Sequence, residues 1–134
     1  MLLEDLVDDF QLFEHWEDRY TYLLDLGKAL PTFPEGERVP ENKVDGCLSQ
    51  VWFVRRASDD GAVAFDADSD SAIVRGLIAV LRVLFYERSA TEVASVDVDD
   101  VFRSLGLDEH LSVNRRNGFY AMVGRVRSIA NGEV

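Results

Sequence analysis

The residue in this chain best suited to chemistry is a single cysteine. Cys47 lies in the segment KVDGCLSQVW, residues 43–52, directly after a glycine and before a run of strand-forming residues. Gly46 can adopt backbone angles closed to other residues, so a tight turn can present the thiol at a loop tip. Ser49 and Gln50 lie beside it and can donate hydrogen bonds. Because a thiolate is a strong nucleophile, the segment predicts sulfur chemistry at a loop.

The same cysteine has a simpler interpretation, as a small buried hydrophobic residue, and the pattern alone leaves both open. One cysteine excludes an intramolecular disulfide and a thioredoxin-like cysteine pair. One thiol cannot hold zinc or an iron–sulfur cluster alone, and His15 and His110 show no ligand spacing with it. We therefore expect no metal and no cofactor. A lone thiol suits a carrier, because a second one would expel bound sulfur and leave a disulfide.

The charge of the chain excludes two classes of partner. The formal net charge is -11, with 25 acidic against 14 basic residues. Such a surface repels phosphate backbones and anionic lipids, so nucleic acid and membrane surfaces are not expected to bind. The most apolar stretch, Ile73 to Phe85, is too short to span a bilayer and contains two arginines. The first ten residues are acidic where a signal peptide is basic, so we expect a cytoplasmic protein.

The elements that must position Cys47 are mostly helical. With 134 residues, 47% of them hydrophobic, we expect one domain spanning residues 1–134. Apolar periodicity and capping residues predict five helices: Leu2–Phe13, Trp16–Ala29, Ala72–Tyr86, Val98–Leu105 and one beginning near Ser112. The helix over 72–86 is apolar almost all round, which is typical of a central core element. Between the second helix and the cysteine, all three prolines fall within residues 30–42 and predict an irregular segment.

A small sheet of two strands joined by one turn is expected. Val51–Val54 are consecutive strand formers, as in a strand covered on both faces. Asp59-Asp60-Gly61 predicts a turn, and Ala62–Asp68 alternates as a partner strand with one face buried. Gly76 inside the long helix costs roughly 1 kcal/mol relative to alanine, which predicts a close-packed neighbour there. The sequence therefore predicts an α+β fold, with helices packed on one face of a small antiparallel sheet.

Several segments resemble a known family. VDGCLSQVW is similar to the V-x-G-C-x-S-x-V-W cysteine motif of the SufE-type sulfur acceptors. Four further segments resemble that family in the same order along the chain: residues 16–20, 26–31, 68–77 and 111–118. One departure is Leu48, where relatives often have a polar residue such as glutamine. The resemblance implies a SufE/IscU-like fold and a working thiol at Cys47.

The resemblance also implies a function. Cys47 would accept persulfide sulfur from a PLP-dependent cysteine desulfurase, either SufS-like or CsdA-like, and stimulate its turnover. The sulfur would then pass to a cluster scaffold, SufB-like, for iron–sulfur cluster assembly. Such a protein is a transfer partner acting through a covalent cysteine persulfide, not a stand-alone enzyme.

Besides Cys47, five residues are expected to belong to the cysteine loop or to the surface that meets the partner: Gly46, Ser49, Gln50, Asp70 and Arg115. The last two are carried over from the resemblance, and simpler roles stay open for both: helix capping for Asp70 and a solvated first turn for Arg115. Lys43 is the nearest base in sequence, while Asp45 would oppose ionisation, so we expect the docked partner to activate the thiol. At rest, the loop is expected to fold the thiol toward apolar neighbours.

Two alternatives remain at this point. An adaptor could bind and stimulate a desulfurase without carrying sulfur. A single-cysteine peroxide sensor would form a sulfenic acid on Cys47 and would not respond to a desulfurase.

Overall fold

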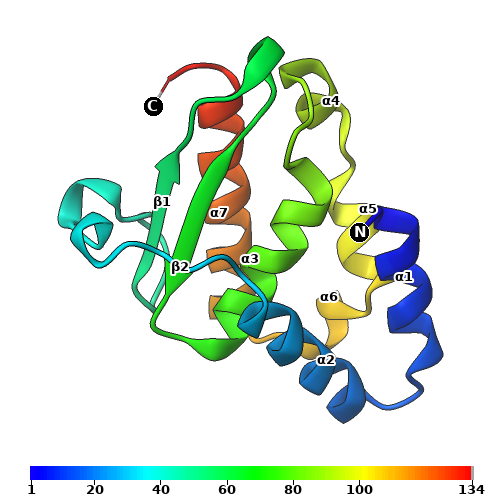
Figure 1. Ribbon diagram of the computed structural model, residues 1–134. Coiled ribbons are helices and arrows are strands. Elements are labelled where there is room, and N and C mark those ends of the chain that lie inside the picture. The colour runs from blue at the N-terminus through cyan, green and yellow to red at the C-terminus, as the bar shows by residue number, and fades with distance from the viewer. Residues whose placement is uncertain (134) are drawn as a thin grey trace.

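The computed structural model describes residues 1–133, apart from the side chain of Asp59. Figure 1 shows a two-stranded antiparallel sheet beside a group of helices, which confirms the predicted α+β class. The elements in chain order are α1 (Leu3–Leu12), α2 (Trp16–Lys28), β1 (Val51–Arg55), β2 (Phe65–Ser69), α3 (Ala72–Phe85), α4 (Ala90–Ser95), α5 (Val98–Ser104), α6 (Leu107–His110) and α7 (Val113–Ala130).

Helix α3 is the centre of the molecule, as its apolar composition predicts. Ten of its 14 residues are buried, and the Ser71 hydroxyl caps it by accepting a hydrogen bond from the Val74 backbone N–H at 3.5 Å. Helix α2 packs directly on it through Gly27 and Gly76. A Cβ at Gly76 would overlap the carbonyl oxygen of Leu23 and lie 2.9 Å from its carbonyl carbon. The predicted close neighbour of Gly76 is therefore confirmed, and it is a helix backbone.

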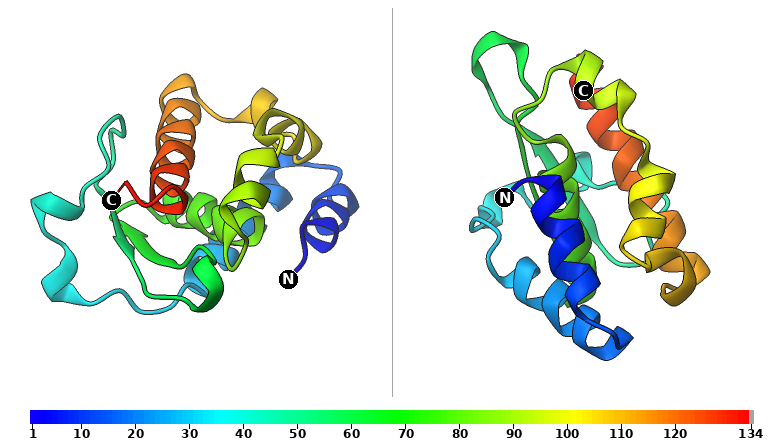
Figure 2. Two further views of the ribbon diagram at one scale, coloured as in Figure 1. Left: turned by 90° about the horizontal axis from the view of Figure 1, so that it is seen from above. Right: turned by 90° about the vertical axis from the view of Figure 1, so that its right-hand side faces the viewer.

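The sheet places its inner face on the helical core. Strands β1 and β2 pair in a register that sets Phe53 opposite Ala67 and Val51 opposite Ser69. Phe53 and Phe65 stack with ring centroids 5.3 Å apart and join the same buried cluster as α3 and α7. Figures 1 and 2 show both helices on this one side of the sheet.

The outer face of the sheet is also covered, and the prediction that β2 buries one face only is wrong. Asp68 on that face is 8% exposed, and Trp52 opposite it is buried. Residues 30–42 fold over both: Phe33 is buried, and Arg38 Nη2 lies 2.5 Å from Asp68 Oδ2. The Arg38 guanidinium also lies over the ring of Trp52, 6.0 Å from its centroid. Sequence periodicity missed this layer because an irregular segment gives no period.

Other differences from the expected elements are local. Before Cys47, Lys43 forms an isolated bridge to Trp52 that the sequence did not indicate. Helices α4 and α6 were not predicted, since six and four residues are too short to show a helical period. Helix α7 begins where it was predicted, directly after Ser112, whose hydroxyl accepts a hydrogen bond from the Arg115 backbone N–H at 3.2 Å. Among the described residues, the helices are too short or too polar to cross a membrane.

Candidate functional site at Cys47

The cysteine lies in a loop that closes on itself before β1 and rests against α7. The Val44 N–H donates to the Val51 carbonyl at 2.9 Å, which joins the two ends of the loop. Gly46 has a φ of +91°, a conformation that favours glycine. A Cβ there would lie 3.3 Å from the Ala121 Cβ of α7, so the loop also approaches the helix closely. The turn expected from Gly46 is therefore present and is directed toward α7.

The thiol of Cys47 is half-buried between this loop and α7. Its Sγ lies 3.6 Å from the carbonyl oxygen of Gly118, to which the S–H donates a weak hydrogen bond. Burial raises the pKa of the Cys47 thiol above its ordinary value, because the thiolate loses hydration. At rest the sulfur is therefore kept in its protonated, weakly nucleophilic form.

Asp70 holds the far side of the loop. Its carboxylate accepts a hydrogen bond from the Gln50 N–H at 3.0 Å, and its own N–H donates to the Gln50 carbonyl at 3.2 Å. The side chain that caps α3 is that of Ser71. The capping interpretation of Asp70 is thus wrong, and the carboxylate instead fixes the chain that leads from Cys47 into β1.

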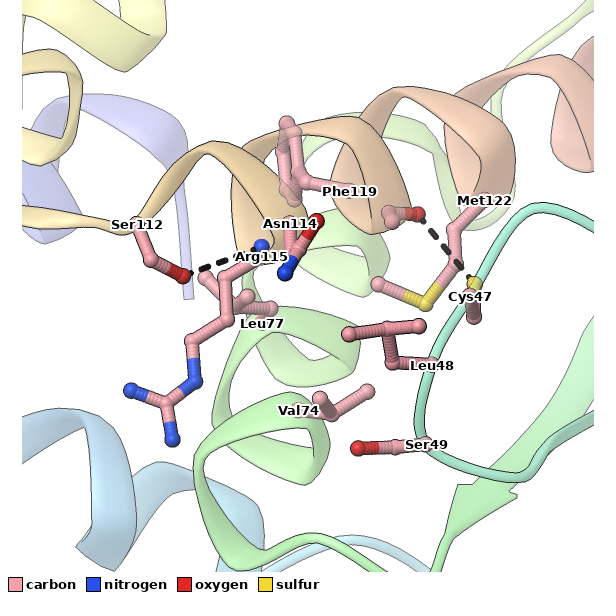
Figure 3. Close-up of a pocket in the computed structure, with 11 residues that line it drawn as sticks. Cys47, Leu48, Ser49, Val74, Leu77, Ser112, Asn114, Arg115, Phe119 and Met122 are labelled. Atoms are coloured by element: carbon pink, nitrogen blue, oxygen red, sulfur yellow. Dashed lines mark hydrogen bonds between the residues drawn. The ribbon is translucent and has the colours of Figure 1, made fainter.

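A pocket of about 410 Å³ opens between the cysteine loop, α3 and α7 (Figure 3). Four side chains form an apolar wall, and four others bring polar groups. The apolar residues are Val74, Leu77, Phe119 and Met122, and the polar ones are Ser49, Ser112, Asn114 and Arg115. Leu48 lines the pocket beside Cys47 while remaining 82% exposed. The thiol therefore borders an apolar wall, and the solvent-exposed Leu48 lies beside it over the same pocket.

The predicted site residues converge on this region to different degrees. Ser49 and Arg115 line the same pocket as Cys47, whereas Gln50 and Asp70 form the loop anchor beside it. Arg115 is exposed, and its guanidinium points away from the sulfur (Figure 3). The structure thus brings all of them to one face, but not into direct contact with the thiol.

Two residues in contact with the cysteine region were not singled out from the sequence. Gly118 lies directly under Cys47, and Met122 follows one turn later on α7. A glycine inside a predicted helix is a usable signal, as Gly76 shows, and the same argument would have found Gly118. Met122 carried no such signal, because its place in the buried stripe of α7 already explains it.

The described residues contain no group of three or more His, Cys, Asp or Glu side chains placed to hold a metal ion. His110 instead stacks on Trp16, with ring centroids 4.6 Å apart.

Comparisons with known proteins show to which family the chain is similar. The family model described as "SufE: Fe-S metabolism associated domain" matches residues 4–130. A SufE-like protein of Rhizobium meliloti (strain 1021) is 44% identical over 135 residues, covering 98% of this chain and 96% of the relative. A SufE-like protein of Rhizobium etli is 46% identical over 131 residues, covering 96% of this chain and 88% of the relative.

A solved structure supports the fold. The solution structure of a hypothetical protein from Thermus thermophilus matches with a TM-score of 0.77. The alignment covers 99% of this chain and 98% of that one at 21% sequence identity. A family match over nearly the whole chain, together with relatives above 40% identity, identifies the protein: the chain belongs to the SufE family of Fe–S metabolism domains.

Proposed function

We propose that this chain is a one-domain cytoplasmic sulfur carrier. Cys47 accepts persulfide sulfur from a PLP-dependent cysteine desulfurase, SufS-like or CsdA-like, and stimulates its turnover. The sulfur is then delivered to a SufB-like scaffold for iron–sulfur cluster assembly. The observation that carries the proposal is a single thiol of a SufE-family chain, held on a loop beside a pocket and free of any resolving cysteine.

The chemistry is an exchange that needs no oxidant. The Cys47 thiolate attacks the outer sulfur of a persulfide on the donor enzyme. A sulfur–sulfur bond forms to Cys47, the bond to the donor cysteine breaks, and the donor thiolate leaves. A thiolate on the scaffold repeats the step on the persulfide of Cys47, which regenerates the thiol after protonation.

The resting geometry requires the loop to open for this exchange. The thiol faces Gly118 on α7 and is half-buried, and its burial raises its pKa, so both its access to a partner and its nucleophilicity are reduced at rest. In contrast, Leu48 next to it is 82% exposed and is ready to contact a partner. We propose that the partner surface takes up Leu48 and draws Cys47 out, and that the donor's own site favours the thiolate there.

The neighbouring residues then have supporting roles. Gly46 supplies the turn, and the hydrogen-bonded pair of Asp70 and Gln50 keeps the base of the loop in place while the tip moves. Ser49 and Arg115, on the rim of the pocket, are placed to meet the partner. These roles concern loop position and docking, while the covalent step belongs to Cys47.

One observation favours a second candidate, an adaptor that stimulates the desulfurase without carrying sulfur. The resting thiol is retracted and protonated, as expected of a cysteine that serves only for packing. Cys47→Ser separates the two functions, with alanine release by the desulfurase as the readout. A carrier loses its stimulation in the variant, whereas an adaptor keeps it.

A further inference from the structure

Gly118 is a buried glycine in the second turn of an 18-residue helix. Glycine in a helix interior is less favourable than alanine, so its presence calls for a reason. The space where its Cβ would lie faces Cys47: Sγ would be 3.5 Å away, the Cys47 Cβ 3.9 Å and its Cα 4.0 Å. The three heavy atoms nearest to a methyl group at position 118 would therefore all belong to Cys47.

The bare thiol does not need this space. A carbon atom at 3.5 Å from Sγ makes an ordinary van der Waals contact, so an alanine would fit beneath the unloaded cysteine. The glycine must therefore be explained by something other than the resting thiol.

A loaded cysteine has a different requirement. The outer sulfur of a persulfide lies about 2.05 Å from Sγ. If it pointed toward α7, it would come within about 2 Å of a methyl carbon at position 118, far inside contact distance. Because Cys47, Gly118 and Met122 line the same pocket, the open volume next to the sulfur borders Gly118.

We propose that Gly118 is a positioning residue that keeps room for the second sulfur, so that the loop can return to its resting place while Cys47 is loaded. This rests on the proposed function, because only a cysteine that carries sulfur needs the room. With alanine at position 118, the thiol still retracts, but the persulfide stays outside the pocket and meets solvent.

Helix α7 supplies a matched control. Gly124 lies on the same helix, and a Cβ there would have no heavy atom within 4 Å. Gly118→Ala and Gly124→Ala make the same chemical change and bring the same gain in helix propensity. Only the first reaches the cysteine.

The test uses the full chain, loaded without a desulfurase. Inorganic polysulfide supplies the sulfur: the Cys47 thiolate takes a terminal sulfur atom, and a polysulfide one sulfur shorter leaves. Cyanide then attacks the outer sulfur, breaks its bond to Sγ and leaves as thiocyanate, whose formation is timed. Alkylation of the unloaded thiol by iodoacetamide is timed in parallel.

We expect loaded Gly118→Ala to release thiocyanate about tenfold faster than wild type, as when the solvent-exposed population of the persulfide rises by that factor. Its unloaded thiol should alkylate at the wild-type rate, and Gly124→Ala should match wild type in both assays. Equal thiocyanate rates for wild type and Gly118→Ala would overturn the proposal. The proposal would also be overturned if Gly118→Ala accelerated alkylation of the unloaded thiol as much as it accelerated thiocyanate release. The space beside Gly118 would then serve the unloaded thiol alone. Chemical loading keeps this result separate from whether a desulfurase uses Cys47.

Discussion

Two helix glycines, Gly76 in α3 and Gly118 in α7, face very different neighbours. Beneath Gly76 lies the backbone of α2, so close that a methyl group would overlap the Leu23 carbonyl oxygen. Next to Gly118 lies the side chain of Cys47, with 3.5 Å between Sγ and the position of a methyl carbon. The first glycine brings two helices together permanently, while the second leaves room beside a group that has to move.

The regions around these glycines are held by different means. Where α2 meets α3, Leu23 has no exposed surface, and Gly27 and Gly76 are buried. The cysteine loop is held mainly by hydrogen bonds, to Asp70 on one side and Gly118 on the other, and Leu48 in the loop is largely exposed. Hydrogen bonds near solvent cost little to open, whereas a buried helix interface opens only with the whole fold. The loop should therefore move while the core stays closed.

The largest expected effect is on the core. Gly76→Ala should lower the free energy of unfolding by about 2 kcal/mol, because overlap with a helix backbone outweighs the gain in helix propensity. Urea denaturation measures it, with Gly124→Ala as the control that should raise stability by up to about 1 kcal/mol. Equal stability of Gly76→Ala and wild type would show that the α2–α3 interface adjusts freely.

Next is the anchor of the loop. Asp70→Ala removes the carboxylate that accepts from the Gln50 N–H, so Cys47 should alkylate roughly fivefold faster, as for the loss of about 1 kcal/mol. Ser71→Ala, one residue on, is the control: it removes the cap of α3 and should lower global stability by about 1 kcal/mol without changing alkylation. If both variants left the alkylation rate unchanged, the anchor would have no role in holding the thiol.

The pH dependence of Cys47 should separate the loop from an exposed thiol. Burial raises its pKa, so alkylation should reach half its maximal rate above the ordinary pKa of about 8.5. The closed loop favours the protonated thiol. The contribution of the protonated thiol to the stability of the closed loop is thus fully present below the ordinary pKa. This contribution is lost as the pH rises through the raised pKa. The measurement is alkylation rate against pH beside a short peptide containing one cysteine, and a midpoint at or below that of the peptide would contradict it.

The smallest effect is expected at the exposed leucine. Leu48→Gln should change the free energy of unfolding by less than about 0.5 kcal/mol, because the side chain already lies in water. It should instead raise severalfold the concentration that gives half-maximal stimulation of a desulfurase. Leu12→Gln is the matched control, 78% exposed on α1 at the opposite side of the molecule (Figures 1 and 2). If the two variants behaved alike, Leu48 would not belong to the docking surface.

The sequence predicted those features that repeat along the chain or depend on one residue type. The apolar pattern located α3 and α7, capping residues marked the start of α3, and Gly76 indicated the tight neighbour that α2 provides. These signals are local, so no knowledge of the tertiary structure was needed.

What the sequence did not predict depends on contacts between distant segments. The layer formed by residues 30–42 over Trp52 and Asp68 is irregular and is held by Arg38, a pairing that no period reveals. For the site, the motif gave Cys47 and its loop, but the contact of its sulfur with Gly118, 71 residues away in the chain, required the fold.

The account depends most directly on whether Cys47 receives sulfur from a donor enzyme. The wild-type protein is incubated with a cysteine desulfurase and cysteine, and its intact mass is then recorded, followed by peptide mapping. The account predicts one added sulfur atom, located on Cys47, removed by reductant and missing in Cys47→Ser. An unchanged mass beside an actively turning desulfurase, or sulfur elsewhere than on Cys47, would contradict it.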